Sequence, residues 1–327
     1  MAGAGVVIGL SAVVMAIRDG EACALTVRPH DPRTSRPSTL PGLPFGSFDP
    51  EGRRTFELAL RAFVTEQTRF DLGYVEQLYT FGDKGRDAPL ADVGEGGARV
   101  ISVGYLALTP PGHAIAAPDT EWSPWPRFFP YEDWRGGRPA VIEEQIAPPL
   151  LSWAGRKQDR AARVRRLFAL DGEGWREERV LERYELLYEA GLAPEAARDR
   201  DRALGRAAPE PDAAHPLGSP MVSDHRRILA TALGRLRGKL RYRPVIFDLT
   251  PPEFTLSELQ RTVEAIVGVP LHKQNFRRGL DRAGLVEGLG RTQAETGGRP
   301  AELFQRRRHA VDGEPAGGLA LPLLREV

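Results

Sequence analysis

Five polar side chains gather in one short stretch of the last quarter of the chain. In order along the chain they are Lys273, Gln274, Asn275, Arg277 and Arg278. Phe276 and Leu280 lie among them at an i, i+4 spacing, which predicts a helix from His272 to Arg282 with one buried and one exposed face. Gln and Asn can read adenine, Arg can read guanine, and other basic residues can hold phosphates. These residue types predict a DNA-reading surface.

The elements around this stretch must position it. Thr255 and Glu258 form a capping box ahead of an apolar helix that Gly268 ends. After the basic helix, Leu285–Gly290 and Ala301–Arg307 are two predicted strands around a Gly-Gly-Arg-Pro turn. Helix, short turn, basic helix and hairpin are the pattern of a winged helix-turn-helix, whose second helix enters the major groove. A small α+β dimerisation domain is the alternative.

A second basic run precedes this region. Between Arg226 and Arg243 there are seven basic residues and no acidic one. The same predicted helix carries an apolar stripe made of Ile228, Leu229, Ala232, Leu233, Leu236 and Leu240. The basic side chains could form an ordinary solvated face or a surface that meets phosphates.

The middle of the chain changes character. It contains an aromatic cluster with interspersed prolines, made of Trp122, Trp125, Phe128, Phe129, Tyr131 and Trp134. This cluster could be a stacking platform for bases or an adenine ring, or a local apolar core that holds an irregular loop. Two charged helical patterns follow, over Gln158–Leu170 and Glu177–Ala190, and the Ala/Pro-rich stretch Ala207–Pro220 is expected to be a surface linker.

The N-terminal region predicts strands around one helix. Val6–Ile17 is a continuous apolar run typical of a buried strand, and it is shorter than the roughly 20 residues that span a bilayer. An Asp-Gly turn should join it to a hairpin partner at Ala22–Val27. Further along, the patterns predict a helix at Thr55–Thr68 and strands at Tyr74–Phe81 and Val100–Leu108.

Composition sets broad limits. With 327 residues, 41% hydrophobic and 27% charged, the chain can bury a sizeable core and is neither disordered nor fibrous. The net charge of +1 gives no information about nucleic acid, so only local charge can. A single cysteine, Cys23, excludes an internal disulfide framework and a multi-cysteine metal site. His113 and His215 lack metal-ligand spacing, so no metal is expected, and neither is a membrane segment or a signal peptide. We expect a cytoplasmic protein.

The chain resembles the Nudix-related transcriptional regulators of NAD metabolism, the NrtR type. The resemblance depends chiefly on Val245–Phe304, with its Phe-Thr-Leu, Glu-Leu-Gln and Gly-Arg-Pro-Ala strings, and on Tyr74–Asp83 in the N-terminal region. The stretch Asp224-His225 followed by Ile228 is similar to the start of the helix that joins the two domains of the family. Trp134-Arg135 and Arg183–Tyr188 look like a subgroup labelled a proteobacterial NAD regulator.

The resemblance implies an α+β fold. It implies an N-terminal Nudix-like α/β/α sandwich with a long helical and aromatic insert, and a C-terminal winged helix-turn-helix. The expected boundaries are a Nudix-like core at 1–111, the insert at 112–220, a basic helix that closes the Nudix-like domain at 221–243, a DNA-binding domain at 244–310 and a tail at 311–327.

The Nudix box is degenerate. In an active box, glutamates on one helix face gather Mg²⁺, which binds pyrophosphate oxygens and activates water. With Arg61 at the box arginine, the glutamate positions hold Arg53, Ala62, Thr65 and Glu66. A register shifted by one residue instead gives Arg54, Phe63, Glu66 and Gln67. Glu66 is the only box glutamate in either register. We therefore predict no enzyme activity, unless other acids such as Asp49, Glu51, Glu57 or Glu76 compensate.

The exchange of carboxylates for arginines could turn a hydrolase pocket into a sensor. Guanidinium groups suit pyrophosphate oxygens, although Arg53 and Arg54 could equally be surface residues. The candidate ligand contacts are Gly46, Phe48, Arg53, Arg54, Arg61, Gln77 and Tyr79. The resemblance implies ADP-ribose or a related NAD metabolite as effector, with no required cofactor.

The main hypothesis is a transcriptional regulator, acting as a repressor, of NAD biosynthesis and salvage genes. It would bind double-stranded operator DNA as a homodimer. The candidate DNA contacts are Thr255, Lys273, Gln274, Asn275, Arg277, Arg278 and Arg299. The alternatives are a divergent Nudix pyrophosphohydrolase acting on ADP-ribose-like nucleotides, and an RNA-binding or protein-interaction module.

Overall fold

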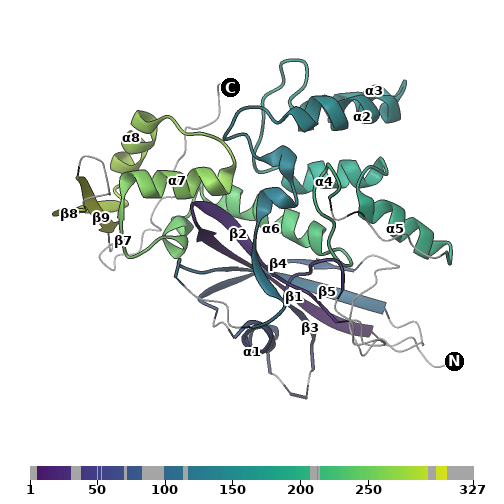
Figure 1. Ribbon diagram of the computed structural model, residues 1–327, viewed down its shortest axis with the longest axis horizontal. Helices are drawn as coiled ribbons and strands as arrows, with labels where there is room; N and C mark the ends of the chain where they lie inside the picture. Colours follow the sequence, from purple (N-terminus) through teal and green to yellow (C-terminus); the bar gives the residue numbers. More distant parts are fainter. Residues whose placement is uncertain are drawn as a thin grey trace.

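The computed structural model describes residues 6–30, 38–49, 51–52, 54–69, 72–82, 99–112, 117–206, 212, 214–293 and 300–307. Its N-terminal part is a β-sheet with helices on both faces (Figure 1). The strand order is β4-β5-β1-β2-β6, and β3 also pairs with β1. The strands are β1 (Val6–Arg18), β2 (Glu21–Val27), β3 (Phe45–Ser47), β4 (Tyr74–Phe81), β5 (Arg99–Leu108) and β6 (Thr120–Pro124).

Strand β1 lies at the centre of the sheet, which confirms the predicted buried strand. It pairs in parallel with β5 and antiparallel with β2 and β3. Val13 and Met15 belong to the core on one face of the sheet, while Leu10 and Val14 belong to the core on the other. A strand covered on both faces must be apolar at every position, and this explains the unbroken apolar run.

Helices cover both faces of the sheet. Helix α1 (Phe56–Thr68) buries Leu60 and Val64 in the smaller core, and α6 (His225–Lys239) buries Leu233 and Leu236 in the larger one. Figure 1 shows α1 below the sheet and α6 above it. The result is an α/β/α sandwich, as expected from the sequence.

The segment after β6 joins the larger core. Trp125, Phe128, Phe129 and Tyr131 are fully buried there, so the stacking interpretation is wrong for these side chains, and the core that they join is the main one. The segment contains short helical turns at Trp125–Arg127 and Pro130–Glu132, a π-helix at Ile142–Ile146, α2 (Ala147–Ala154), α3 (Gln158–Phe168), α4 (Val180–Glu189) and α5 (Pro194–Ala203). The expected surface linker is buried at its end, where Leu217 is 3% exposed.

The C-terminal part packs two helices against a small sheet. Its elements are a 3-10 helix at Val245–Leu249, β7 (Glu253–Thr255), α7 (Leu256–Val267), α8 (Lys273–Ala283), β8 (Val286–Gln293) and β9 (Ala301–Arg306). The sheet order is β7-β9-β8. The capping box at the start of α7 is present, and Gly268 ends α7 with a φ of 76°. Strand β7 was not predicted, and the expected turn at the tip of the hairpin falls largely outside the described residues.

No helix in the described ranges is long and apolar enough to cross a membrane.

Candidate functional site

Helix α8 presents the predicted polar face. Phe276 and Leu280 are each 1% exposed, as their i, i+4 spacing predicts. The opposite face exposes Lys273, Gln274, Arg277 and Arg278. Within the parts of the chain that the structure describes, no ion pair neutralises Lys273 or Arg277. Uncompensated basic side chains on a helix that projects from its domain can contact phosphates and base edges in a major groove.

The other candidate DNA contacts are placed differently. Asn275 is half-buried, and its Oδ1 accepts a hydrogen bond of 2.7 Å from Arg278. Thr255 is 2% exposed, and its hydroxyl accepts a hydrogen bond from the backbone N–H of Glu258, so its side chain caps α7. Arg299 lies outside the described residues. The exposed face is therefore centred on α8, with Asn275 orienting one of its arginines.

The basic run on and after α6 has a different role from either interpretation of its sequence. Arg226 and Arg237 are each 1% exposed, and Lys239 is 4% exposed. Five of the seven basic residues pair with carboxylates from other elements: Arg226 with Glu195, Arg227 with Glu185, Arg237 with Glu132, Lys239 with Glu76, and Arg241 with Glu177. These five paired residues thus form neither a solvated face nor a phosphate-binding surface, and only Arg235 and Arg243 of the run are exposed outside these pairs. The five pairs hold the N-terminal part of the chain together.

The pair of Lys239 and Glu76 joins α6 to β4. The ammonium also donates to the hydroxyl of Tyr74 at 3.0 Å. Burial alone would lower the pKa of Lys239, but its hydrogen bonds to Glu76 and Tyr74 outweigh burial and raise the pKa above its ordinary value. The lysine therefore stays charged, and it fixes the end of α6 on the sheet.

Helix α1 decides between the two registers of the Nudix box. Phe63 packs against β3, where a Cβ added to Gly46 would lie 3.2 Å from its ring. Gln67 exchanges hydrogen bonds with the backbone of Phe45, at 2.6 and 3.3 Å. Phe63 and Gln67, two of the four residues that the shifted register would place at glutamate positions, therefore point to the interior. This geometry favours the register with Arg61 at the box arginine.

In that register the outward face of α1 is nearly free of acid. Leu58 is 53% exposed, Ala62 and Thr65 are half-buried, and Glu66 is exposed. Of the acids that could compensate, Glu57 pairs with Arg61 and Glu76 pairs with Lys239 on the opposite side of the sheet. Across the described ranges, no group of three His, Cys, Asp or Glu side chains could hold a metal ion.

The candidate ligand residues next to α1 are mostly engaged with the protein. The Arg61 guanidinium donates to Glu57 and to the carbonyls of Leu72 and Gly73, at 2.5 and 3.1 Å for the carbonyls. Phe48 is half-buried and packs edge-to-face on Phe56. Gly46 lies under Phe63, as described above. Arg54 is exposed just before the helix, and Arg53 lies outside the described residues.

A β-bulge separates Gln77 from Tyr79. Gln77 pairs with Tyr105, whose side chain is in the core under α1, so Gln77 faces the α1 side. The register then shifts, and Leu78 and Tyr79 together oppose Gly104. Tyr79 is 62% exposed, and its ring contacts that of Phe81, which belongs to the core under α6. Tyr79 therefore lies away from the other candidate ligand contacts.

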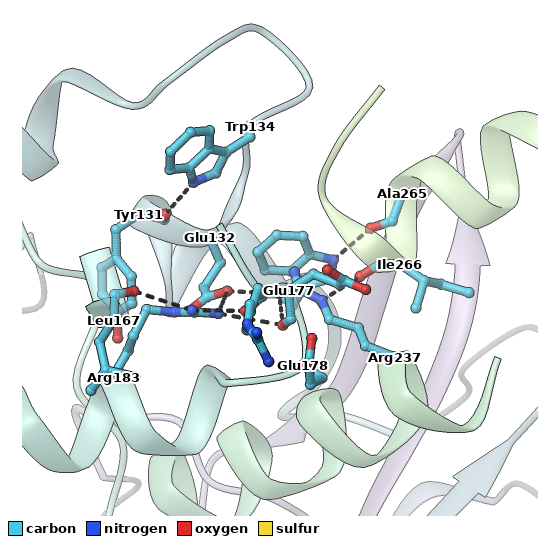
Figure 2. A network of polar contacts seen from close by, with 12 residues as sticks. Tyr131, Glu132, Trp134, Leu167, Glu177, Glu178, Arg183, Arg237, Ala265 and Ile266 are labelled. Carbon is cyan, nitrogen blue, oxygen red and sulfur yellow. Dashed lines mark hydrogen bonds and ion pairs between the residues drawn. The ribbon is translucent and has the colours of Figure 1, made fainter. Parts of the chain in front are cut away.

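A buried ionic cluster next to the end of α7 was not predicted from the sequence. Figure 2 shows Glu132 between Arg183 and Arg237, and all three side chains are fully buried. Glu132 receives two hydrogen bonds from Arg183, at 2.5 and 2.8 Å, and one from Arg237 at 2.6 Å. One signal was present in the sequence: Arg183 lies three residues after Val180 and four before Leu187, on an apolar helix face.

The geometry defines the class of protein: a Nudix-like sandwich with a helical insert, joined to a winged helix-turn-helix. Solved structures have the same fold. Shewanella oneidensis NrtR matches with a TM-score of 0.53 at 20% identity, over 92% of this chain and 94% of that chain. The same protein in complex with a 27mer DNA gives a TM-score of 0.51. A MutT/nudix family protein from Enterococcus faecalis gives 0.51 at 14% identity, over 92% of this chain and 86% of its own.

The sequence comparisons are more specific for the C-terminal domain. Residues 246–305 match the family model of the NrtR DNA-binding winged helix domain, so the resemblance expected from the sequence is confirmed there. The chain is also similar to the ADPR responsive transcriptional repressor NtrR of Acinetobacter baylyi, with 42% identity over 85 residues. That match covers 26% of this chain and 34% of the relative's length.

Proposed function

We propose that this protein is a transcriptional repressor of NAD biosynthesis and salvage genes that responds to ADP-ribose or a related nucleotide. The observation that carries the proposal is the exposed basic face of α8 inside the segment that matches the NrtR winged helix model. The names of the relatives support the rest: one is an ADPR responsive repressor, and one was crystallised with DNA.

For DNA binding, α8 enters the major groove of the operator. Gln274 and Arg278 contact base edges, with Asn275 orienting Arg278, and Lys273 and Arg277 contact phosphates. Arg299 is a further proposed DNA contact, and Thr255 acts by capping α7. One winged helix reads few base pairs, so the protein binds a palindromic site as a homodimer.

For effector binding, the Nudix-like domain holds the nucleotide and does not cleave it. On the outward face of α1, Ala62 and Thr65 occupy positions where a hydrolase needs carboxylates, and only Glu66 remains, so Mg²⁺ lacks a sufficient set of protein ligands there. Arg53 and Arg54 bind the pyrophosphate, and Gln77 contacts the nucleotide from β4. Arg61 ties α1 to the loop before β4 and shapes this site.

A gel-shift assay at fixed salt tests the proposal. The probes are DNA from upstream of the protein's own gene and of neighbouring NAD genes, each with and without ADP-ribose, NAD and nicotinate mononucleotide. We expect specific retention that ADP-ribose releases. Retention no stronger than that of competitor DNA under every condition would contradict the proposal. Mg²⁺-dependent release of AMP from ADP-ribose, abolished by Glu66→Ala, would instead establish the alternative, a divergent Nudix pyrophosphohydrolase.

A further inference from the structure

Three donors from outside the winged helix meet the last carbonyls of α7. The indole N–H of Trp125 donates to Ala265 O at 2.7 Å, and Arg237 Nε donates to Ile266 O at 2.9 Å. The backbone N–H of Trp134 donates to Gly268 O at 2.5 Å. The carbonyls at the end of a helix have no partner within it, and a cation there also interacts favourably with the helix dipole. The end of α7 is therefore fixed by the insert and by α6.

The insert and the end of α7 approach each other too closely at Gly268 for a residue with a side chain. A Cβ added to Gly268 would lie 2.4 Å from the carbonyl oxygen of Glu132 and 3.1 Å from the ring of Trp125. The glycine also has a φ of 76°, which disfavours other residues. Helix α7 consequently cannot move toward or slide across this contact unless the insert moves with it.

The same contact is backed by the buried ionic cluster. Arg237 uses one guanidinium group to hold Glu132, the carbonyl of Glu177 at 2.9 Å and the end of α7 (Figure 2). Its guanidinium also lies 4.8 Å from the centre of the Trp125 ring. A buried charge with this many partners has one favourable position, so the cluster sets a single docking geometry for the winged helix.

Helix α6 connects this contact to the sheet. Lys239, two residues after Arg237, is bound to Glu76 and Tyr74 on β4. Strand β4 also carries Gln77, a proposed contact of the nucleotide. A ligand that shifts β4 therefore acts on the helix that holds the end of α7.

We propose that the insert and α6 form a clamp on α7, and that the effect of the nucleotide on DNA affinity passes through it. Trp125 and Arg237 are its positioning residues: they contact neither DNA nor nucleotide and set the orientation of α8 through α7. This inference rests on the proposed function. It assigns a role to the insert, because the aromatic segment supplies two of the three donors.

The test is the ratio of operator Kd with ADP-ribose to operator Kd without it. Trp125→Phe keeps a buried ring and removes only the N–H that Ala265 O accepts. Arg237→Lys keeps the charge and removes the fork that reaches Glu132 and Ile266 together. We expect both variants to lower the ratio at least threefold, toward 1, while calorimetry without DNA gives an ADP-ribose Kd within twofold of wild type.

Trp153→Phe is the matched control. Trp153 is a half-buried indole on α2 in the same insert, and it packs against Arg160. This variant should keep the wild-type ratio. Wild-type ratios in folded Trp125→Phe and Arg237→Lys proteins would overturn the clamp. A wild-type protein that does not bind the operator, or whose binding ADP-ribose leaves unchanged, would instead overturn the proposed function and with it this inference.

A measurement on the wild-type protein keeps the proposal testable if both variants fail to fold. Saturating ADP-ribose should change hydrogen-exchange protection both in the last turn of α7 and in β4, and leave α2 unchanged. A change in β4 without one in α7 would overturn the clamp as the route.

Discussion

Helices α6 and α8 are both rich in basic residues, and the structure uses them in opposite ways. On and just after α6, five basic side chains are paired with carboxylates from β4, the insert, α4 and α5. On α8, Lys273, Arg277 and Arg278 are exposed, and only Arg278 has a polar side-chain partner among the described residues, the neutral Asn275.

The difference shows that local charge density does not identify a nucleic-acid surface. A basic helix is available to phosphate only if no distant carboxylate reaches it. For α6, those carboxylates belong to segments distant in the sequence: Glu195 on α5 pairs with Arg226, and Glu76 on β4 pairs with Lys239. Basic side chains on α6 should therefore matter for folding, and those on α8 for DNA binding.

The largest expected effect is on stability, in the buried cluster. Glu132→Gln leaves Arg183 and Arg237 buried without a counter-charge, so we expect it to lower the free energy of unfolding by about 3–5 kcal/mol. Urea unfolding followed by circular dichroism measures this loss. Glu144→Gln, at an exposed position of the same segment, should change stability by less than about 0.5 kcal/mol. A loss below about 1 kcal/mol at Glu132 would mean that the two buried arginines do not depend on this carboxylate for stability.

The second effect is on DNA binding by α8. Lys273→Ala combined with Arg277→Ala should weaken operator binding by the proposed homodimer. The double variant removes two phosphate contacts from each protomer, so the slope of log Kd against log salt should fall by about 3.6, at about 0.9 for each lost phosphate contact. Stability should stay within about 0.5 kcal/mol of wild type, because both side chains are exposed. Arg235→Ala, which removes an exposed arginine of α6, is the control. If it reduced the slope as well, α6 would share the DNA surface.

The third effect is on sequence preference. Asn275→Ala removes the acceptor that orients Arg278, so we expect the operator's guanine preference at one position to weaken. A bidentate arginine contributes about 1–3 kcal/mol of discrimination, and the variant should lose part of it, about 1 kcal/mol. Competition between operators with single base changes measures the loss. Uniform weakening across all sequences would mean that Asn275 contributes only general affinity.

The smallest effect is a pH dependence next to α6. Burial and the nearby charge of Arg226 lower the pKa of His215 below its ordinary value of 6.5, and its Nδ1 accepts a hydrogen bond of 3.2 Å from Leu217 N–H. The unfolded chain then binds more protons than the folded one, so stability is full above about pH 6.5 and declines as the pH falls toward the lower folded pKa. His215→Gln should flatten the curve of melting temperature against pH in that range. An unchanged curve would contradict the shift.

Much of the fold could be predicted because its signals are local. The apolar run of β1, the Asp-Gly turn, the capping box at Thr255 and the glycine that ends α7 each act within a few residues. The exposed face of α8 followed from the spacing of Phe276 and Leu280. The helix α2, with prolines in its first turn, and the short strands β6 and β7 were not predicted, because they depend on packing and pairing with distant segments.

The sequence by itself indicated most of the strands and helices and which residues have the chemistry to read DNA, because hydrophobic period and side-chain chemistry are local properties. Only the tertiary structure decided which charges remain available. It placed Glu132 between two arginines, turned Tyr79 away from Gln77 by a bulge, and brought Trp125 against the end of α7. The physical reason is that ion pairing and burial depend on contacts between segments far apart in the chain, and a linear pattern does not contain those contacts.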